Sequence, residues 1–319
     1  MLMKNIRALV TGGCGFIGSH LVEALLNRNC EVIVLDDLST GKRENIKLFE
    51  PCKNFTFVRG DVRNLDLVKA VVKDVEVIFH MAAIPSVLRS VENPFLTHEV
   101  NVTGTLNVLK AGLDAGVKRV VYASSSSVYG DVKALPRRED MPTFPISPYG
   151  VSKLAAEQYC KAFYRVYGLP TVCLRYFNVY GPRQTYGPYS GVITIFINKA
   201  LKGESPVIYG DGEQTRDFTN VVDVVQASFL AAKNKQAIGE VFNVATGKPT
   251  TINLLAKKIL KLCGRSDIKP KYAPPRPGDV KFSYADISKA QRILGYNPSV
   301  ELDEGLANLI EWFRVEARK

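Results

Sequence analysis

The sequence predicts an α/β protein with a doubly wound parallel sheet and a smaller C-terminal α/β lobe. Short apolar, β-branched runs alternate with helical patterns over the first half of the chain, a rhythm typical of parallel strands joined by crossover helices. These runs are apolar throughout, as expected when helices cover both faces of a sheet. A glycine-rich turn follows the first run and opens a helix, as in Rossmann-like nucleotide-binding folds.

The elements follow one another in strand and helix order. Strands are expected at Ile6–Thr11, Glu31–Leu35, Phe55–Arg59, Glu76–Phe79, Lys118–Ala123 and Thr171–Arg175. Helices are expected near Ile17–Asn27, Leu65–Val72, Pro94–Ala115 and Pro148–Tyr167. A doubly wound sheet binds its ligand beyond the carboxyl ends of its strands, so residues just after each strand are candidates for a site.

After Gly181, proline and glycine break the pattern and the helices become shorter. We therefore expect residues 1–176 to form a nucleotide-binding domain and residues 177–319 a lobe for the substrate. The segment Val221–Ala232, within about residues 218–245, is expected to return partly to the first domain.

Composition excludes several classes of protein. The 319 residues are 46% hydrophobic and 23% charged, which excludes a disordered chain and a small disulfide scaffold. The six cysteines show no Cys-x-x-Cys spacing and there are three histidines, so we expect no metal site and reduced cysteines in a cytoplasmic protein. No signal-peptide pattern is seen and no apolar run reaches about 18 residues, so no membrane association is expected.

The chain carries 42 Lys and Arg against 31 Asp and Glu, a net charge of +11 that suggests an anionic partner. Basic residues concentrate in the second half, between Lys248 and Lys281. No basic stripe interleaved with aromatic residues is visible, so we expect a small phosphate-bearing ligand rather than nucleic acid.

The glycine turn has the spacing of a dinucleotide-binding loop. Gly12, Gly15 and Gly18 allow a tight turn, close approach of a pyrophosphate and close packing of the helix. Asp36 ends the second strand, where a carboxylate can bind both ribose hydroxyls and repel a 2′-phosphate. The expected cofactor is NAD rather than NADP.

Two further strand ends carry polar side chains. Asp61 could reach the adenine, or it could cap the helix that begins at Leu65. His80 is followed by Met81, Ala82 and Ala83, whose small side chains would let the backbone run close to a cofactor.

Tyr149 and Lys153 are four residues apart at the start of a predicted helix, so both project from one face. A tyrosine with a pKa near its usual value of about 10 acts as a base at neutral pH only if its phenolate is stabilised. A nearby ammonium supplies such stabilisation, and a serine hydroxyl from the run Ser124–Ser127 would complete a proton relay.

Together, the motifs TGGCGFIG, SSVYG, YGVSK and RYFNVYG resemble those of the extended short-chain dehydrogenase/reductase family, and within it those of UDP-hexose 4-epimerases. The resemblance implies that Tyr149 is the catalytic base, that Lys153 binds the nicotinamide ribose, and that Ser125 is the relay hydroxyl, with Ser126 as the adjacent candidate. Asn101 matches an asparagine beneath the family's active site, although it could simply be a buried polar residue.

The resemblance also implies the remaining contacts. Cofactor contacts are expected from Gly12, Gly15, Phe16, Ile17, Gly18, Asp36, Asp37, Leu38, Ser39, Thr40, Gly41, Asp61, Val62, Met81, Ala82, Ala83, Asn101, Ser124, Tyr149, Lys153 and Tyr176. Substrate contacts are expected from Ser86, Arg89, Ser125, Ser126, Tyr149, Asn178, Val192, Val207, Tyr209, Arg216, Arg276, Asp279 and Ser283. Arg216 and Arg276 would clamp the substrate diphosphate.

The implied reaction is epimerisation at carbon 4 of a UDP-hexose through a 4-keto intermediate, with NAD taking the hydride and returning it. Related dehydratases and decarboxylases carry acidic residues after the relay hydroxyl, where this chain has Ser126 and Ser127. Those two activities are the alternatives, together with a non-catalytic NAD-binding member, which the intact Tyr149 and Lys153 disfavour.

Two finer expectations follow from the same resemblance. Ser283 stands where family members restricted to glucose and galactose carry tyrosine, so UDP-GlcNAc and UDP-GalNAc are expected substrates, alone or beside UDP-Glc and UDP-Gal. The helices near Pro94–Ala115 and Pro148–Tyr167 carry surplus apolar surface and are expected to pair across a homodimer axis as a four-helix bundle, unless they are buried within one subunit.

Overall fold

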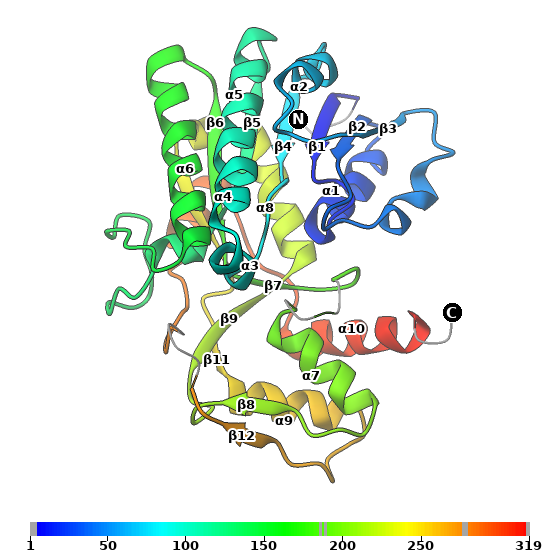
Figure 1. Ribbon diagram of the computed structural model, residues 1–319, viewed down its shortest axis with the longest axis vertical. Coiled ribbons are helices and arrows are strands. Elements are labelled where there is room, and N and C mark those ends of the chain that lie inside the picture. The colour runs from blue at the N-terminus through cyan, green and yellow to red at the C-terminus, as the bar shows by residue number, and fades with distance from the viewer. Residues whose placement is uncertain (1–4, 185–186, 188–189, 276–279, 317–319) are drawn as a thin grey trace.

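The computed structural model describes residues 5–184, 187, 190–275 and 280–316. Its main feature is a seven-stranded parallel sheet with the order β10-β6-β5-β4-β1-β2-β3, which confirms the predicted doubly wound architecture (Figure 1). The strands are β1 (Arg7–Thr11), β2 (Glu31–Asp36), β3 (Phe55–Arg59), β4 (Val77–His80), β5 (Arg119–Ser125), β6 (Thr171–Tyr176) and β10 (Val241–Val244). The order reverses between β1 and β4, which is where such sheets bind ligands.

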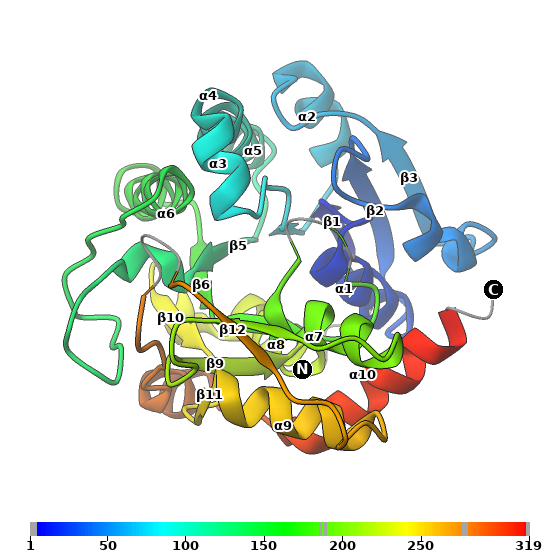
Figure 2. The same cartoon turned by 60° about the horizontal axis from the view of Figure 1, so that its bottom comes forward.

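Helices cover both faces of this sheet, which explains why its strands are apolar throughout. Figure 2 shows α1 (Phe16–Leu26) and α8 (Val221–Lys233) on one face. The other face carries α2 (Leu65–Val72), α5 (Gly104–Asp114) and α6 (Pro148–Tyr167). A separate hydrophobic core fills each interface between the sheet and its helices.

The second lobe has two small sheets and its own core. One sheet contains β7 (Asn178–Tyr180), β9 (Thr215–Asn220) and β11 (Pro249–Thr251), and the other contains β8 (Val207–Tyr209) and β12 (Lys271–Ala273). The helices that pack around them are α7 (Val192–Leu201), α9 (Ile252–Leu262) and α10 (Leu302–Glu316). In Figure 1 this lobe lies below the large sheet, so the carboxyl ends of β1 and β4 face it.

Most predicted elements occur within one or two residues of their expected bounds. The helix predicted near Pro94–Ala115 is interrupted, since α4 (Pro94–His98) and α5 are joined by a π-helical turn at Glu99–Thr103. A short helix, α3 (Val87–Glu92), precedes them and has no counterpart in the prediction. Strand β10 lies beside β6 and α8 packs against α1, so this later part of the chain joins the large sheet.

A search of the described residues for a helix long and apolar enough to cross a bilayer finds none.

Candidate active site

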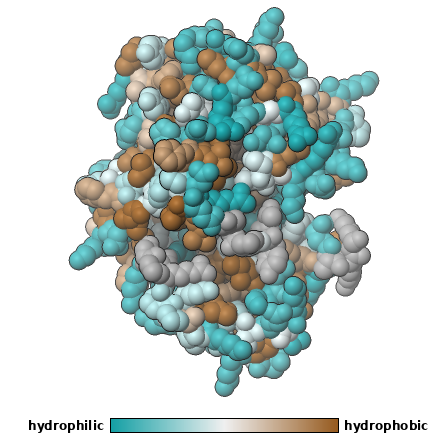
Figure 3. Space-filling model, viewed as in Figure 1, coloured by the Kyte–Doolittle hydropathy of each residue, from teal (hydrophilic) through white to brown (hydrophobic). Residues whose placement is uncertain are grey.

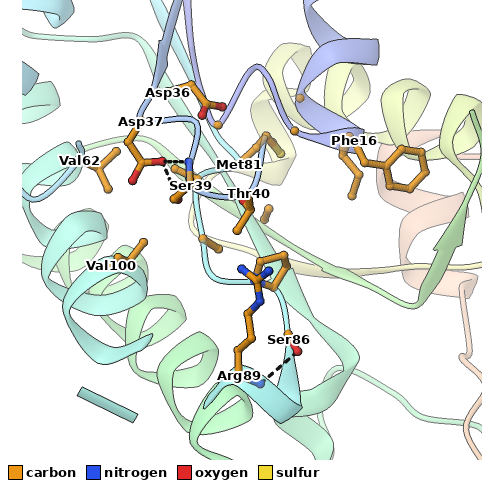
Figure 4. A pocket seen from close by; sticks show the side chains of 18 of the residues that line it. Phe16, Asp36, Asp37, Ser39, Thr40, Val62, Met81, Ser86, Arg89 and Val100 are labelled. Atoms are coloured by element: carbon orange, nitrogen blue, oxygen red, sulfur yellow. Dashed lines mark hydrogen bonds between the residues drawn. The ribbon is translucent and has the colours of Figure 1, made fainter. Parts of the chain in front are cut away.

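A cavity of about 480 Å³ lies at the carboxyl ends of the central strands. It gathers residues from the loops after β1, β2, β3 and β4 and from the segment before α7 (Figure 4). The predicted residues that line it are Gly12, Gly15, Phe16, Ile17, Gly18, Asp36, Asp37, Ser39, Thr40, Asp61, Val62, Met81, Ala82, Ala83, Ser86 and Arg89. Segments far apart in the sequence therefore meet in one hollow at the switch point of the sheet.

The glycine loop is built so tightly that side chains do not fit. Gly12 has a φ of +68°, and a Cβ there would lie 2.7 Å from the backbone nitrogen of Ala82. A Cβ at Gly18 would collide with the carbonyl oxygen of Gly12. The loop thus brings Gly12 directly against Ala82, two residues after the end of β4.

Replacing Gly12 with alanine is expected to lower the free energy of unfolding by about 2–4 kcal/mol, since it combines a disfavoured φ with crowding against Ala82. Gly116 is the matched control, because its φ is +67° but a Cβ there meets nothing within 4 Å. Gly116→Ala should cost only about 1 kcal/mol. Urea unfolding of both variants tests this, and equal losses would show that crowding at Gly12 is unimportant.

Asp36 is held in the cavity by backbone hydrogen bonds. Its two carboxylate oxygens accept from the N–H groups of Cys14 and Leu38, each at 2.8 Å. The side chain is 6% exposed, and burial raises its pKa although these hydrogen bonds oppose the shift. Leu38 adopts a φ of +64°, which lets its N–H turn back to Asp36. The neighbouring Asp37 accepts from the N–H and the hydroxyl of Ser39 at 2.9 and 2.6 Å.

Asp61 lines the cavity, and the alternative that it caps α2 is wrong. Asn64 caps that helix instead, since its side chain accepts from the N–H of Leu67 at 3.1 Å. Asp61 is paired with Arg63 at 2.6 Å. Partial burial opposes the shift, yet the hydrogen bonds from Arg63 lower the pKa of Asp61, so it remains a carboxylate.

His80 has a structural role in a buried chain of hydrogen bonds. Thr105 donates its hydroxyl to the Asn101 carbonyl at 2.6 Å, so it accepts from His80 Nε2 at 2.9 Å. The other ring nitrogen, Nδ1, lies 2.7 Å from the Thr11 hydroxyl. Burial and the nearby charge of Lys153 lower the pKa of His80 to about 3, so the ring is neutral. Within the described residues, no group of three or more His, Cys, Asp or Glu side chains is arranged to hold a metal ion.

The predicted base and lysine lie on the first turns of α6. This helix is capped by Ser147, whose hydroxyl accepts from the N–H of Gly150 at 3.1 Å. Lys153 is 4% exposed, and its ammonium donates to the carbonyl of Ala123, a cavity residue, at 2.8 Å. Burial lowers the pKa of Lys153 to about 7. Tyr149 shares a hydrogen bond with Ser125; burial raises its pKa, and this hydrogen bond lowers it.

Neighbouring serines of the run Ser124–Ser127 point their hydroxyls at different partners. Ser125 ends β5 and accepts from the N–H of Ser127 at 3.1 Å, which fixes the turn that carries Ser126 and Ser127. Ser124 instead donates to a carboxylate of Glu157 on α6 at 2.9 Å. The structure thus brings Ser125 to Tyr149 and directs the Ser124 side chain to a buried group.

Asn101 and Tyr176 support the site from behind. Asn101 is 1% exposed, accepts from the N–H of Ile84 at 2.8 Å and donates to the Ser152 hydroxyl at 2.9 Å. Ser152 in turn donates to the carbonyl of Tyr149 at 2.8 Å, so Asn101 ties the π-helical turn to the start of α6. The hydroxyl of Tyr176 lies 3.0 Å from that of Ser228 on α8.

Besides Ser125, Ser126 and Tyr149, the predicted substrate residues fall into three groups. Ser86 caps α3 by accepting from the N–H of Arg89 at 3.2 Å, and Figure 4 shows the Arg89 side chain extending into the cavity. In the second lobe lie Asn178 on β7, Val192 on α7, Val207 and Tyr209 on β8, Arg216 on β9, and Ser283, whose N–H donates to the Thr215 carbonyl at 3.2 Å. Arg276 and Asp279 lie outside the described residues.

Several cavity residues were absent from the prediction. They are Leu35, Gly60, Pro85, Val100, Ala123, Gln184, Gly187, Ser190 and Gly191. Most are apolar or glycine and contribute backbone or shape, which single-sequence motifs do not mark. The glycines at 187 and 191, in a proline- and glycine-rich segment just before α7, were the one available signal for a loop beside the site.

Comparison with known proteins adds to this geometry. The chain matches the model of the NAD dependent epimerase/dehydratase family over residues 8–245. It is 43% identical over 311 residues to a UDP-glucose 4-epimerase of Mycolicibacterium smegmatis, covering 97% of this chain and 99% of that protein.

Two solved structures are also similar over nearly their full length. One is a UDP-glucose 4-epimerase from Thermotoga maritima with UDP-glucose, with a TM-score of 0.92 and 42% identity over 98% of this chain and 100% of that one. The other is a UDP-N-acetylglucosamine 4-epimerase from Methanobrevibacter ruminantium in complex with UDP-N-acetylmuramic acid, with a TM-score of 0.93 and 42% identity over 98% of this chain and 100% of that one. The similarity therefore extends over both lobes.

Proposed function

This chain belongs to the NAD dependent epimerase/dehydratase family, and from that premise we propose that it is an NAD-dependent UDP-hexose 4-epimerase. The observation that carries the proposal is the pairing of Tyr149 and Lys153 on α6 with Ser125 and the cavity residue Ala123 on β5. Relatives at 42–43% identity over both lobes are 4-epimerases of UDP-glucose and UDP-N-acetylglucosamine.

The cavity fits NAD. Gly12, Gly18 and Gly41 allow the loop to fold tightly beside the cavity, since a Cβ at each would lie within 3 Å of other backbone atoms, at Gly41 within 2.8 Å of Cys14. The loop faces the N-terminus of α1, which favours a pyrophosphate. The Asp36 carboxylate accepts hydrogen bonds from two N–H groups and has further lone pairs that can accept from ribose hydroxyls. The adjoining segment, Asp37 to Gly41, and Asp61 with Val62 are proposed to enclose the adenosine.

The residues of α6 and β5 carry the proton chemistry. Tyr149 takes the proton of the sugar 4-hydroxyl through Ser125 or directly, and returns it when the ketone is reduced. Lys153 favours the phenolate form because its ammonium lies on the same helix face. NAD, when bound, supplies the acceptor and donor of the hydride at carbon 4. Since both half-reactions use the same groups, no further acid or base is required.

The serines after Ser125 favour epimerisation over the alternatives. Elimination of water requires an acid and a base besides the tyrosine. Ser126 and Ser127 stand in the 3₁₀ turn beside Ser125, and neither side chain ionises at neutral pH. We therefore rank dehydration and decarboxylation below epimerisation.

The proposed function is tested by incubating the purified protein separately with UDP-GlcNAc and UDP-Glc and resolving the carbon-4 epimers by NMR. At least one substrate should reach an equilibrium mixture with its epimer. No product from either substrate, even with NAD supplied, would contradict the proposal.

Ser283 is proposed to leave space for an N-acetyl group at sugar carbon 2. Its small side chain is half-buried at the strand end beside Thr215. Ser283→Tyr should lower kcat/KM for UDP-GlcNAc at least about 100-fold, while UDP-Glc changes less than about threefold, because an aromatic ring would fill the space that only the acetamido group uses. Unchanged turnover of both substrates would rule out this pocket.

The second lobe is proposed to hold the UDP moiety. Arg216 and Arg276 would clamp the diphosphate, with Asn178 and Asp279 beside them, since guanidinium pairs with two phosphate oxygens at once. Val192, Val207 and Tyr209 would pack against the uridine. We accordingly propose a boundary between the NAD-binding domain and the substrate lobe at residues 176 and 177. Part of the segment 218–245 returns to the first domain.

The protein is also proposed to be a cytoplasmic homodimer. Exposed apolar side chains are found on the neighbouring helices α3, α4 and α6, including Val91 (64%), Phe95 (81%) and Val151 (52%). Figure 3 shows hydrophobic side chains gathered in the region where Figure 1 places α3 and α4. These side chains would be covered if the helices from α4 to α6 packed against the same helices of a second copy of the chain. Light scattering after size-exclusion chromatography should give about twice the monomer mass, and a monomer at micromolar concentration would contradict the bundle.

A further inference from the structure

Helix α6 contacts the end of β5 at three successive residues. Lys153 donates to the carbonyl of Ala123 at 2.8 Å, and Tyr149 shares a hydrogen bond with Ser125. Between them, Ser124 donates to Oε2 of Glu157 at 2.9 Å. Positions 149, 153 and 157 are each four residues apart and so lie on one face of the helix. The proposed mechanism uses only the first two of these three side chains.

Glu157 is a fully buried carboxylate with strong partners. It is 0% exposed and accepts from Nε and Nη2 of Arg175 at 3.0 and 2.7 Å. Arg175 is 2% exposed and lies on β6 as the cross-strand partner of Ser124. The Glu157 carboxylate on α6 therefore bonds to both β5 and β6. Its partner on β5, Ser124, directly precedes Ser125, whose hydroxyl bonds to Tyr149. Such a group is costly to bury unless it stays fully paired, so its geometry is tightly restricted.

Arg175 also contacts Tyr129, which is bonded to the neighbouring strand β10. Its guanidinium carbon lies 4.7 Å from the ring centroid of Tyr129. The Tyr129 hydroxyl donates to Oδ1 of Asn243 on β10 at 2.7 Å. The pair Glu157 and Arg175 thus joins the end of β5 to buried side chains beside β6 and β10 rather than to solvent.

We propose that Glu157 is a positioning residue for the proton relay: by holding Ser124, it sets the end of β5 so that the Ser125 hydroxyl meets Tyr149. This inference rests on the proposed function of Tyr149. A purely structural ion pair would stabilise the fold without affecting the ionisation of Tyr149. The charged and titratable groups around this face come from four elements and the turn after β5. They are Lys153, Cys160 and Lys161 from α6, Cys173 and Arg175 from β6, Tyr122 from β5, His80 from β4 and Tyr129 from the turn.

Ser124→Ala tests the proposal because it removes the link to β5 and leaves the Glu157–Arg175 pair intact. The conservative variant Ser124→Thr keeps the hydroxyl. Ser90→Ala is the control, since Ser90 is also a buried serine but donates only to Val87 within α3. Each protein is compared by urea unfolding, by kcat and KM from pH 6 to pH 10, and by phenolate absorbance titrated against the same protein carrying Tyr149→Phe.

The hydrogen bond from Ser125 lowers the pKa of Tyr149, so a displaced Ser125 should raise it. We expect Ser124→Ala to raise this pKa by about 1 unit and to lower kcat at pH 7 about tenfold, with recovery at higher pH and KM within about twofold of wild type. Ser124→Thr should restore most of kcat, and Ser90→Ala should match wild type.

An unchanged Tyr149 pKa in Ser124→Ala would overturn the positioning role, whatever happens to stability. So would a loss of kcat that higher pH does not recover. Failure of the proposed function is distinguishable, because the wild-type protein would then show no epimerase turnover while the absorbance titration could still be read.

Discussion

Replacing Tyr149 with phenylalanine is expected to lower kcat for carbon-4 epimerisation at least about 1000-fold. The variant keeps the ring that packs at the start of α6 but loses the oxygen that bonds to Ser125 and is proposed to exchange the proton with the sugar 4-hydroxyl. A positioned general base contributes about 10²–10⁴ to a rate, and here one group serves both directions of the reaction. Steady-state kinetics with UDP-GlcNAc and UDP-Glc would measure the loss.

Tyr159→Phe is the matched control for this substitution. Tyr159 lies on the same helix and is 40% exposed, away from the cavity. Its variant should retain the wild-type kcat, and both variants should bind UDP as the wild type does. Full activity in Tyr149→Phe would exclude Tyr149 as the base.

Lys153→Met is expected to lower kcat by about 100- to 1000-fold at pH 7. The substitution keeps a long side chain of similar volume but removes the ammonium that is proposed to favour the Tyr149 phenolate, and with it the bond to the Ala123 carbonyl. NAD affinity should also fall, since Lys153 is proposed to bind the nicotinamide ribose. Lys110→Met, on the exposed face of α5, serves as the control for loss of a lysine charge.

The same variant makes a prediction for pH dependence. In the folded protein the pKa of Lys153 is lowered by burial to about 7, against 10.5 for an unperturbed lysine. Between these values the unfolded chain binds more protons than the folded one, so this group's contribution to stability increases as pH rises. The unfolding free energy of the wild type should therefore increase relative to Lys153→Met between about pH 7 and pH 10.5. A constant difference over that range would contradict the lowered pKa.

Features that depend on local sequence could be predicted. The glycine loop follows from spacing, because the tight φ at Gly12 and the close packing at Gly18 leave room only for glycine. Strand and helix order followed from apolar periodicity, and the expected role of Asp36 followed from its place at the end of β2.

Features that depend on tertiary contacts could not be predicted from the sequence. Nothing in the local sequence marks Glu157 as buried, since it lies on a polar stretch of α6 and is paired only when Arg175 arrives from β6. Likewise, Asp61 and Asn64 are both good helix caps, and the hydrogen bond to Leu67 decides between them. Strand β10 is short and pairs with β6 across 64 intervening residues, a long-range pairing that local propensity does not reveal.

The central claim is that hydride leaves carbon 4 of the sugar and returns to the other face of the same carbon. It is tested most directly with a UDP-hexose that carries deuterium at carbon 4, incubated with the protein in ordinary water and followed by NMR. The account predicts that the epimer forms with its deuterium retained at carbon 4. Loss of that deuterium to solvent, or a product that lacks a hydroxyl group in place of an epimer, would contradict it.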